Sequence, residues 1–417
     1  MKKAFFVVVI VSVLALSACA SPTGVDPTQP SSSDQVATVV AGTMQALSSN
    51  TPAAVTPESP AELLPRTLYY LGNDGVSNIA QIYRLERDGK TTTQLTSEPN
   101  CKGVDGYDVS LVDGTLAFVA DNQLLLVNAD GSNRRVLVDG GPNTDGNDPC
   151  VFKDPLSNPV FSPDGQTIAY ARGGLNLYDI STGVSKLVIE HQRTDLGFPI
   201  ETYSPIRYSP DGTKLLVAMG QWEAPPATVV YYPDTNALVR IEKQQDDLSC
   251  CSQHGGPVWS SDSSSFYGVA IPLTFCCQTG ELWKVDAGNG AVTRSLKMTF
   301  EDSGTFSLPK ELYPAPDGQL YFFFGTYSRD SGFLAPRALN MVRSVPNGEA
   351  DRTVLRDENF IMMNEALWAP DAGFVIVATA PSRDWNQGGG VLELYYTDRQ
   401  KSPVWLAPFG SQMKWGP

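Results

Sequence analysis

Residues 160–170 read VFSPDGQTIAY and contain the clearest structural signal in the chain. A run of strand-forming residues ends at an aromatic side chain, a Pro-Asp-Gly turn follows, and a second strand-forming run begins. Proline presets φ at the first turn position, aspartate bonds to the local backbone, and glycine adopts the left-handed conformation that the exit requires. The stretch therefore predicts two antiparallel β-strands joined by a tight turn.

The same turn recurs along the chain, as clear copies at 210–212 and 316–318 and in degenerate form elsewhere. The turn aspartates are Asp113, Asp164, Asp211, Asp262, Asp317 and Asp371. Their spacing is about 50 residues with some drift, which is a period typical of repeat architectures. The sequence therefore predicts an array of similar units in place of two unrelated domains.

A third strand-forming segment follows each of these hairpins and leads through a polar turn to a fourth. The third segments are residues 82–85, 124–127, 175–178, 229–232, 282–285, 339–342 and 392–395. Short strands with turn signals at regular spacing are typical of a β-propeller. Because seven third segments are present, we predict an all-β, seven-bladed β-propeller with four-stranded antiparallel blades.

The two ends of the folded region complete one repeat. The chain ends at residues 415–417 with the aromatic-small-proline phrase that opens the hairpin, but no second strand follows it. Residues 67–71 form a strand-like segment that can supply the continuation. We therefore expect the C-terminal strand to complete blade 1 and close the ring, which removes the open edges of the array.

An aromatic side chain stands two residues before the turn proline position in most units. These residues are Phe161, Tyr208, Trp259, Trp368 and Trp415. We expect them to pack between neighbouring blades, in preference to forming a carbohydrate-binding ring.

These repeats resemble those of TolB-like propellers, which are similar to the propeller of prolyl-oligopeptidase and dipeptidyl-peptidase enzymes. The strongest matches are residues 160–170 and 82–96, and the resemblance covers residues 67–417 as a repeat architecture. TolB proteins have six blades after an α/β domain, so their partnership with a peptidoglycan-associated lipoprotein is not transferred to this chain. Prolyl-oligopeptidase relatives carry a hydrolase domain, and we expect none here because the sequence stops where the ring closes.

The N-terminal residues 1–18 have the features of a lipoprotein signal peptide: two lysines, an apolar run and small residues before Cys19. This segment resembles a bacterial lipobox, which implies a lipidated Cys19 at the mature N-terminus. An ordinary signal peptide with an incidental cysteine is the alternative. Residues 19–65 are rich in Ser, Thr, Pro and Ala and are expected to form a tether before the propeller of residues 66–417. The predicted location is the extracytoplasmic side of a bacterial cell envelope membrane.

The amino-acid composition restricts which ligands and metal sites the protein can have. A formal net charge of −15 disfavours nucleic acid as a partner. His191 and His254 are the only histidines in the sequence, which excludes sites with several histidine ligands. His254 lies near several cysteines in the sequence, so a zinc site is a hypothesis there. Residues 143–148 are rich in oxygen ligands, so a calcium site is a hypothesis for that segment, although an Asx-rich turn is its simpler interpretation. We predict no cofactor.

The remaining cysteines favour disulfides, because their number is even and the chain is expected to be exported. They are Cys101, Cys150, Cys250, Cys251, Cys276 and Cys277. We predict a Cys101–Cys150 bridge and one or two bridges between the pair at 250–251 and the pair at 276–277, with the pairing there left open.

All six cysteines map to the face that carries the longer loops, including those expected at residues 189–204, 297–311 and 325–338. Loops on a rigid scaffold commonly hold recognition residues. The candidate binding residues on this face are Trp222, Tyr327, Arg329, Arg383, Asp384 and Trp385.

Two functions are compatible with these features. The first is a monomeric, lipid-anchored, non-catalytic binding or scaffold module for an envelope protein, peptide or glycan. The alternative is a propeller hydrolase or lyase with a carboxylate-based site in the central channel. A deep channel with converging acidic and arginine side chains and a perturbed carboxylate favours the enzyme, whereas a plugged channel with an exposed aromatic patch favours binding.

Overall fold

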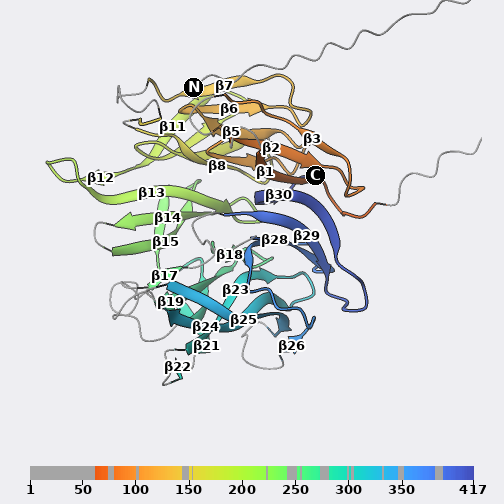
Figure 1. The fold of residues 1–417 in the computed structure, drawn as a ribbon. Helices are drawn as coiled ribbons and strands as arrows, with labels where there is room; N and C mark the ends of the chain where they lie inside the picture. The colour runs from red at the N-terminus through yellow and green to blue at the C-terminus, as the bar shows by residue number, and fades with distance from the viewer. Residues whose placement is uncertain are drawn as a thin grey trace, which may run out of the picture. The chain divides into compact units, whose positions relative to one another are not determined.

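The computed structural model contains only β-strands, turns and irregular segments in the part of the chain that it describes, which confirms the all-β prediction (Figure 1). The described residues are 62–73, 79–99, 103–142, 150–152, 154–221, 224–241, 251–253, 256–272, 281–297, 300–301, 305–330, 333–345, 352–380 and 388–417. Within these ranges no helix is long and apolar enough to cross a membrane.

Two sheets have four strands each, paired antiparallel in the orders β4-β5-β6-β7 and β11-β10-β9-β8. Their strands are β4 (Gly106–Val109), β5 (Leu116–Ala120), β6 (Gln123–Val127), β7 (Arg135–Asp139), β8 (Ser157–Phe161), β9 (Thr167–Ala171), β10 (Gly174–Asp179) and β11 (Val184–Glu190).

Three further sheets have five strands each. The first contains β12 (Gln192–Arg193), β13 (Pro199–Tyr208), β14 (Leu215–Gln221), β15 (Ala224–Tyr232) and β16 (Ala237–Arg240). The second contains β17 (Cys251–Gln253), β18 (Val258–Trp259), β19 (Ser265–Pro272), β20 (Glu281–Asp286) and β21 (Val292–Lys297). The third contains β22 (Phe300–Glu301), β23 (Thr305–Pro314), β24 (Leu320–Asp330), β25 (Phe333–Ser344) and β26 (Thr353–Val354).

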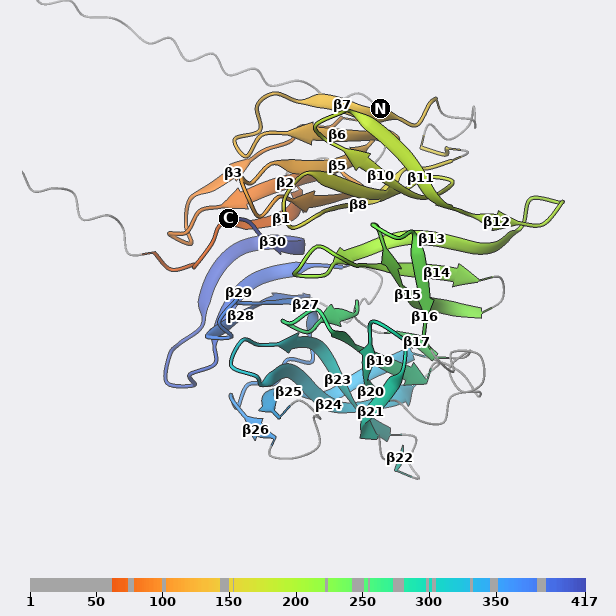
Figure 2. The same ribbon diagram turned by 180° about the vertical axis from the view of Figure 1, so that it is seen from behind.

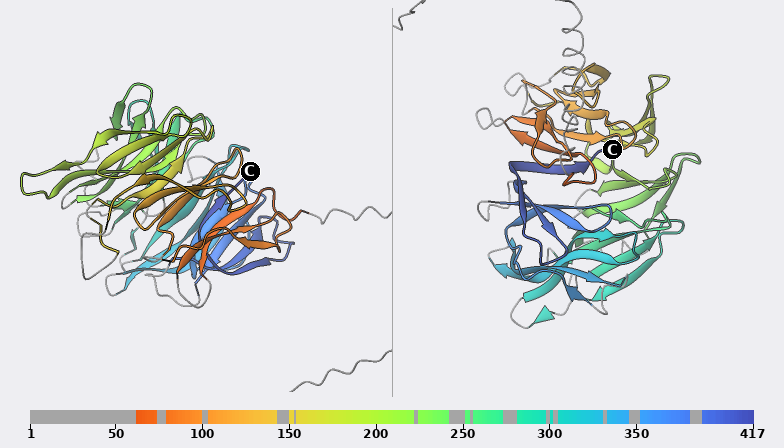
Figure 3. Two further views of the ribbon diagram at one scale, coloured as in Figure 1. Left: turned by 90° about the horizontal axis from the view of Figure 1, so that it is seen from above. Right: turned by 90° about the vertical axis from the view of Figure 1, so that its right-hand side faces the viewer.

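A seven-stranded sheet joins the two ends of the described chain (Figures 1 and 2). Its strands are, in spatial order, β27 (Met363–Trp368), β28 (Phe374–Thr379), β29 (Gly390–Tyr396), β30 (Val404–Trp415), β1 (Leu68–Asn73), β2 (Ala80–Leu85) and β3 (Thr92–Gln94). Strand β30 pairs with β29 from Val404 to Gly410 and with β1 from Ser411 to Trp415. The predicted pairing of the C-terminal strand with residues 67–71 is therefore confirmed, and Figure 3 shows the C-terminus beside the orange strands.

The repeat predicts these strands well. Each third segment of the sequence repeat lies within a strand of the structure, namely β2, β6, β10, β15, β20, β25 and β29. The predicted long loops at 189–204, 297–311 and 325–338 are wrong in part, because β13, β23, β24 and β25 extend through much of them. Pairing along these extensions satisfies backbone groups that a loop leaves to water.

The Ser-Pro-Asp-Gly turns have the expected geometry. The Ser162 hydroxyl donates to Asp164 Oδ1 at 2.5 Å, and the residue after Asp164 is Gly165 with φ of +69°. The same position is left-handed even where it is Ser263 (φ +59°) or Ala372 (φ +57°). The turn backbone is therefore conserved between units although its glycine is not.

The repeat aromatics pack between neighbouring sheets, as expected. Trp259 and Trp368 are buried, and each indole Nε1 donates to a carbonyl on the inner strand of the preceding sheet: Arg207 O at 3.2 Å and Glu311 O at 2.8 Å. Trp415 Nε1 similarly donates to Trp368 O at 2.7 Å. These bonds tie adjacent inner strands together around a common centre.

Candidate functional site

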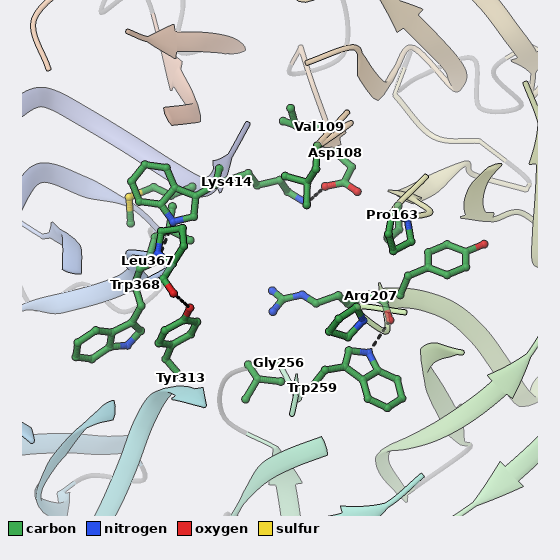
Figure 4. Close-up of a pocket in the computed structure, with 18 of the residues that line it drawn as sticks. Asp108, Val109, Pro163, Arg207, Gly256, Trp259, Tyr313, Leu367, Trp368 and Lys414 are labelled. Carbon is green, nitrogen blue, oxygen red and sulfur yellow. Dashed lines mark hydrogen bonds and ion pairs between the residues drawn. The ribbon is translucent and has the colours of Figure 1, made fainter. Parts of the chain in front are cut away.

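A cavity of about 610 Å³ lies at this centre and is lined by residues of β4, β8, β13, β18, β23, β27 and β30 (Figure 4). These are the innermost strands of their sheets, and the lining residues include the turn prolines. The volume falls in the range of small-molecule sites in proteins.

Bulges in the inner strands aim side chains into this cavity. The pairing register shifts between Lys310 and Tyr313 in β23, and Glu311 within that bulge has a φ of +53°. In β30 the register shifts opposite residues 69–71 of β1, near Gln412, whose φ is +50°. A bulge redirects a side chain that the regular alternation would send elsewhere. A left-handed non-glycine residue costs conformational energy, so the surrounding contacts hold Glu311 in place.

The walls of the cavity are mainly aromatic and apolar. Tyr313 and Trp368 stack with ring centroids 6.4 Å apart and an interplanar angle of 10°. The Tyr313 hydroxyl donates to Pro370 O at 2.7 Å, so the polar end of this ring is occupied. The lining also contains the aromatic residues Phe161, Tyr208, Trp259 and Trp415 and apolar residues such as Val160.

Asp108 and Lys414 form an ion pair at the cavity, with Nζ and Oδ1 2.8 Å apart. The second oxygen of Asp108 accepts a hydrogen bond from the Phe161 backbone N at 2.7 Å. Both charges therefore have protein partners, and this pair bridges β4 and β30 (Figure 4).

Lys310 and Glu365 are also held by protein groups. Lys310 Nζ donates to Met363 O at 3.1 Å and to Asn364 O at 3.0 Å. Glu365 accepts hydrogen bonds from the backbone N of Gln412 at 2.7 Å and of Met413 at 2.5 Å. These contacts connect β23, β27 and β30 behind the cavity wall.

Arg207 and Glu311 differ from these four residues. The side chain of neither makes a hydrogen bond or ion pair with any residue in the described ranges. Arg207 is exposed, and its guanidinium extends into the open centre of the cavity (Figure 4). Glu311 is half-buried and lines the same cavity.

Desolvation by the cavity walls shifts the pKa of both groups. Desolvation raises the pKa of Glu311 to about 7, with Lys310 and Arg207 opposing the shift and Glu365 adding to it. The surrounding protein also desolvates the Arg207 guanidinium, although solvent still reaches it through the cavity, and this lowers the pKa of Arg207 against the attraction of Asp108 and Glu311. The cavity thus holds a carboxyl group that changes its charge near neutral pH beside a cation.

The candidate binding residues named from the sequence are not tested by this geometry. Trp222, Arg383, Asp384 and Trp385 lie outside the described residues, and of Tyr327 and Arg329 only the backbone, within β24, is described. These last two therefore occupy a strand and not a loop.

The cysteine, lipidation and calcium predictions also remain predictions. Cys19, Cys101, Cys250, Cys276, Cys277 and residues 143–148 lie outside the described residues. Cys150 is half-buried, and Cys251 begins β17 instead of lying in a loop. In the ranges that the structure describes, no three metal-ligating side chains come together.

Sequence reasoning missed the cavity residues because it assigned function to the opposite, long-loop face. A signal was available: Arg207 and Lys414 each stand immediately before a repeat aromatic on an inner strand. A charged residue on the innermost strand of a propeller points either into the central channel or into a costly buried environment.

No family model and no curated protein sequence matches the chain. Among solved structures, one from a study of two prolyl endopeptidases has a TM-score of 0.53 at 13% identity and covers 86% of this chain and 50% of its own. Prolyl oligopeptidase B from Galerina marginata has a TM-score of 0.53 at 11% identity, with 86% and 51% covered. TolB from Acinetobacter baumannii has a TM-score of 0.40 at 16% identity, with 84% and 83% covered.

This chain spans about half the length of the prolyl peptidases that it matches. At such low identity the likeness concerns the fold alone. The structural neighbours include TolB and prolyl-oligopeptidase proteins, whose repeats the sequence resembles. The likeness to the prolyl peptidases shows that the described part of the chain has an all-β fold of this propeller type.

Proposed function

We propose that the chain is a seven-bladed propeller that acts as an extracytoplasmic binding module and binds its ligand in the central cavity. The blade count is supported by the two-part pairing of β30. Its residues up to Gly410 serve as the outer strand after β27–β29, and its residues from Ser411 serve as the inner strand before β1–β3. With this division the seven-stranded sheet becomes two four-stranded blades that share one long strand.

The observation that carries the binding function is the cavity itself. It has the volume of a small-molecule site, aromatic walls, and three charged side chains, Arg66, Arg207 and Glu311, without a hydrogen-bond or ion-pair partner among the described residues. Such convergence of a few polar groups in an apolar pocket is typical of ligand sites. The proposed ligand is a peptide, a glycan fragment or a segment of an envelope protein.

The proposed location depends on the N-terminal sequence. Residues 1–18 support export and Cys19 supports lipid attachment, while the tether of residues 19–65 gives the propeller reach from a membrane. A charge of −15 supports a neutral or basic partner for the outer surface and disfavours nucleic acid.

A cavity-filling variant tests the binding function. Ala366 lines the cavity, so Ala366→Trp in the full chain is expected to abolish capture of ligands from envelope extract, identified by mass spectrometry. Ala237→Trp adds the same bulk on the exposed outer strand β16 and should capture the same ligands as wild type. Equal capture by both variants rules out the cavity as the binding site.

An acid–base enzyme is the second candidate function, and the raised pKa of Glu311 is the observation that favours it. A carboxyl group that titrates near neutral pH inside a cavity suits general acid–base catalysis. Substrate screens with the full chain are expected to show turnover that Glu311→Gln removes while binding persists. Turnover that is unchanged in this variant eliminates Glu311 as the catalytic group.

A further inference from the structure

The charged groups at the cavity divide into two classes. Asp108 and Lys414 in the lining, and Lys310 and Glu365 behind it, already bond to protein atoms. Arg66, Arg207 and Glu311 line the cavity without such a bond to a described residue. We propose that Arg207 is the anion-binding residue of the cavity and that the ligand is a small carboxylate-bearing molecule with a ring or apolar body. This inference deepens the proposed binding function and rests on it.

Charge balance supports an anionic ligand. The Asp108–Lys414 pair is neutral and Lys310 offsets Glu365, so Arg207 and Arg66 supply the remaining positive charge beside a carboxyl group that is only partly ionised near pH 7. Arg66, from the segment before β1, also lines the cavity. The surroundings therefore favour negative charge at the centre.

The geometry of the Arg207 guanidinium favours an anion that presents two oxygens side by side, as a carboxylate does. A guanidinium presents a planar fork of donors that matches a carboxylate through two parallel hydrogen bonds. The nearby Asp108 carboxylate instead bonds to Lys414 Nζ and to the Phe161 backbone N, and it forms no hydrogen bond with Arg207. The Arg207 donors therefore face open space in which a ligand carboxylate can pair with them.

The protonation state of Glu311 changes the affinity of the cavity for the ligand carboxylate. When it is protonated, it can donate a hydrogen bond to the same ligand and adds no repulsion; when it is ionised, it repels the ligand carboxylate. The groups that act on its charge are Lys310 on β23, Glu365 on β27 and Arg207 on β13. Ligand binding should therefore be accompanied by proton uptake near neutral pH.

The walls define the rest of the ligand. The indole Nε1 groups of Trp259, Trp368 and Trp415 all donate to backbone carbonyls, and the Tyr313 hydroxyl donates to Pro370 O. The polar ends of these rings are thus occupied, which leaves apolar ring surface for the ligand. A flat or apolar body beside the carboxylate fits such a wall.

The test is titration calorimetry of the full chain with two matched probe pairs. N-acetyl-phenylalanine and its amide represent a peptide end, and glucuronate and glucose represent an acidic sugar. We expect at least one acid to bind about tenfold to a hundredfold more tightly than its neutral partner. Arg207→Met should abolish that preference, whereas Arg399→Met, at an exposed position, should retain it.

Proton linkage provides an independent measurement. Wild-type affinity for the acid should increase as pH falls through about 7, and Glu311→Gln should bind with little dependence on pH. Thermal melting checks that the variants are folded, and Arg207→Lys should bind more weakly than wild type because it loses the planar fork. Binding of neither acid, equal binding by Arg207→Met, or tighter binding at higher pH overturns the inference. If Ala366→Trp still blocks ligand capture in that case, the binding function stands and only the anion specificity fails.

Discussion

Glu311 shows how much a single residue can depend on its surroundings. It combines a left-handed backbone, a half-buried carboxyl group and a carbonyl that accepts the Trp368 indole N–H at 2.8 Å. None of these properties is encoded by glutamate itself. They follow from the bulge in β23 and from the inner strand of the next sheet.

Replacing Glu311 by glutamine should stabilise the protein, and more so at alkaline pH. The folded-state pKa of about 7 is above the ordinary value for glutamate, so the folded state loses stability as pH rises toward and through 7. Glu311→Gln removes this loss, with an expected gain of roughly 1–3 kcal/mol in the free energy of unfolding at pH 8. Urea unfolding at pH 5 and pH 8 measures the effect, and an equal gain at both values contradicts it.

At the scale of elements, the repeated turn is defined by backbone conformation more than by residue identity. The position after the turn aspartate is left-handed at Gly165 and Gly318, and also at Ser263 and Ala372. In the turn that contains Ser263, the aspartate is Asp262. Hydrogen bonds from Ser260 Oγ and from the Ser264 backbone N and hydroxyl lower the pKa of Asp262 to about 2. The side-chain bonds can therefore hold the turn where glycine is absent.

Gly318→Ala isolates the conformational cost of this turn. Gly318 has a φ of +77°, and a Cβ added there meets no atom within 4 Å, so strain is the only expected effect. We expect a loss of about 1 kcal/mol in the free energy of unfolding. Gly388 is equally open but is not left-handed, so Gly388→Ala is the matched control and should be nearly neutral. Equal effects in the two variants contradict the strain argument.

Disulfides are the second prediction at this scale. Intact-mass analysis of exported protein under non-reducing conditions should show Cys101 joined to Cys150 and at least one bridge between residues 250–251 and 276–277. Reduction should lower the melting temperature, because each bridge restricts the unfolded chain. Detection of six free thiols contradicts this prediction.

At the scale of the whole described unit, β30 connects the chain ends. Its last residues supply the Lys414 ion pair with Asp108, the Trp415 bond to Trp368 O and the backbone donors to Glu365. Closure, the cavity wall and the placement of two charged side chains thus depend on one strand.

Deleting residues 410–417 should therefore lower the melting temperature strongly and abolish ligand binding. The truncated protein loses the pairing of β30 with β1 and exposes the edge of β1. Calorimetry measures the change, and deletion of Pro417 alone serves as the mild control, because its hydrogen bond with Thr67 is long at 3.4 Å. An unchanged melting temperature after the longer deletion contradicts the closure.

The all-β fold, the period of the repeat and the pairing of the chain ends could be read from local patterns. The turn motif at residues 160–170 acts through φ preferences and short-range hydrogen bonds, and these are properties of neighbouring residues in the chain. The same is true of the aromatics such as Trp259, whose regular position predicts packing between sheets.

The candidate site in the cavity depends on long-range packing and electrostatics and not on local sequence patterns. Arg207 and Glu311 are about a hundred residues apart in the sequence, and each belongs to a different sheet. Their proximity, their lack of partners in the described chain and the raised pKa of Glu311 arise only when β13 and β23 face one centre. Local sequence preferences specify the strands and turns, whereas desolvation and electrostatics at the cavity depend on distances that the assembled sheets create.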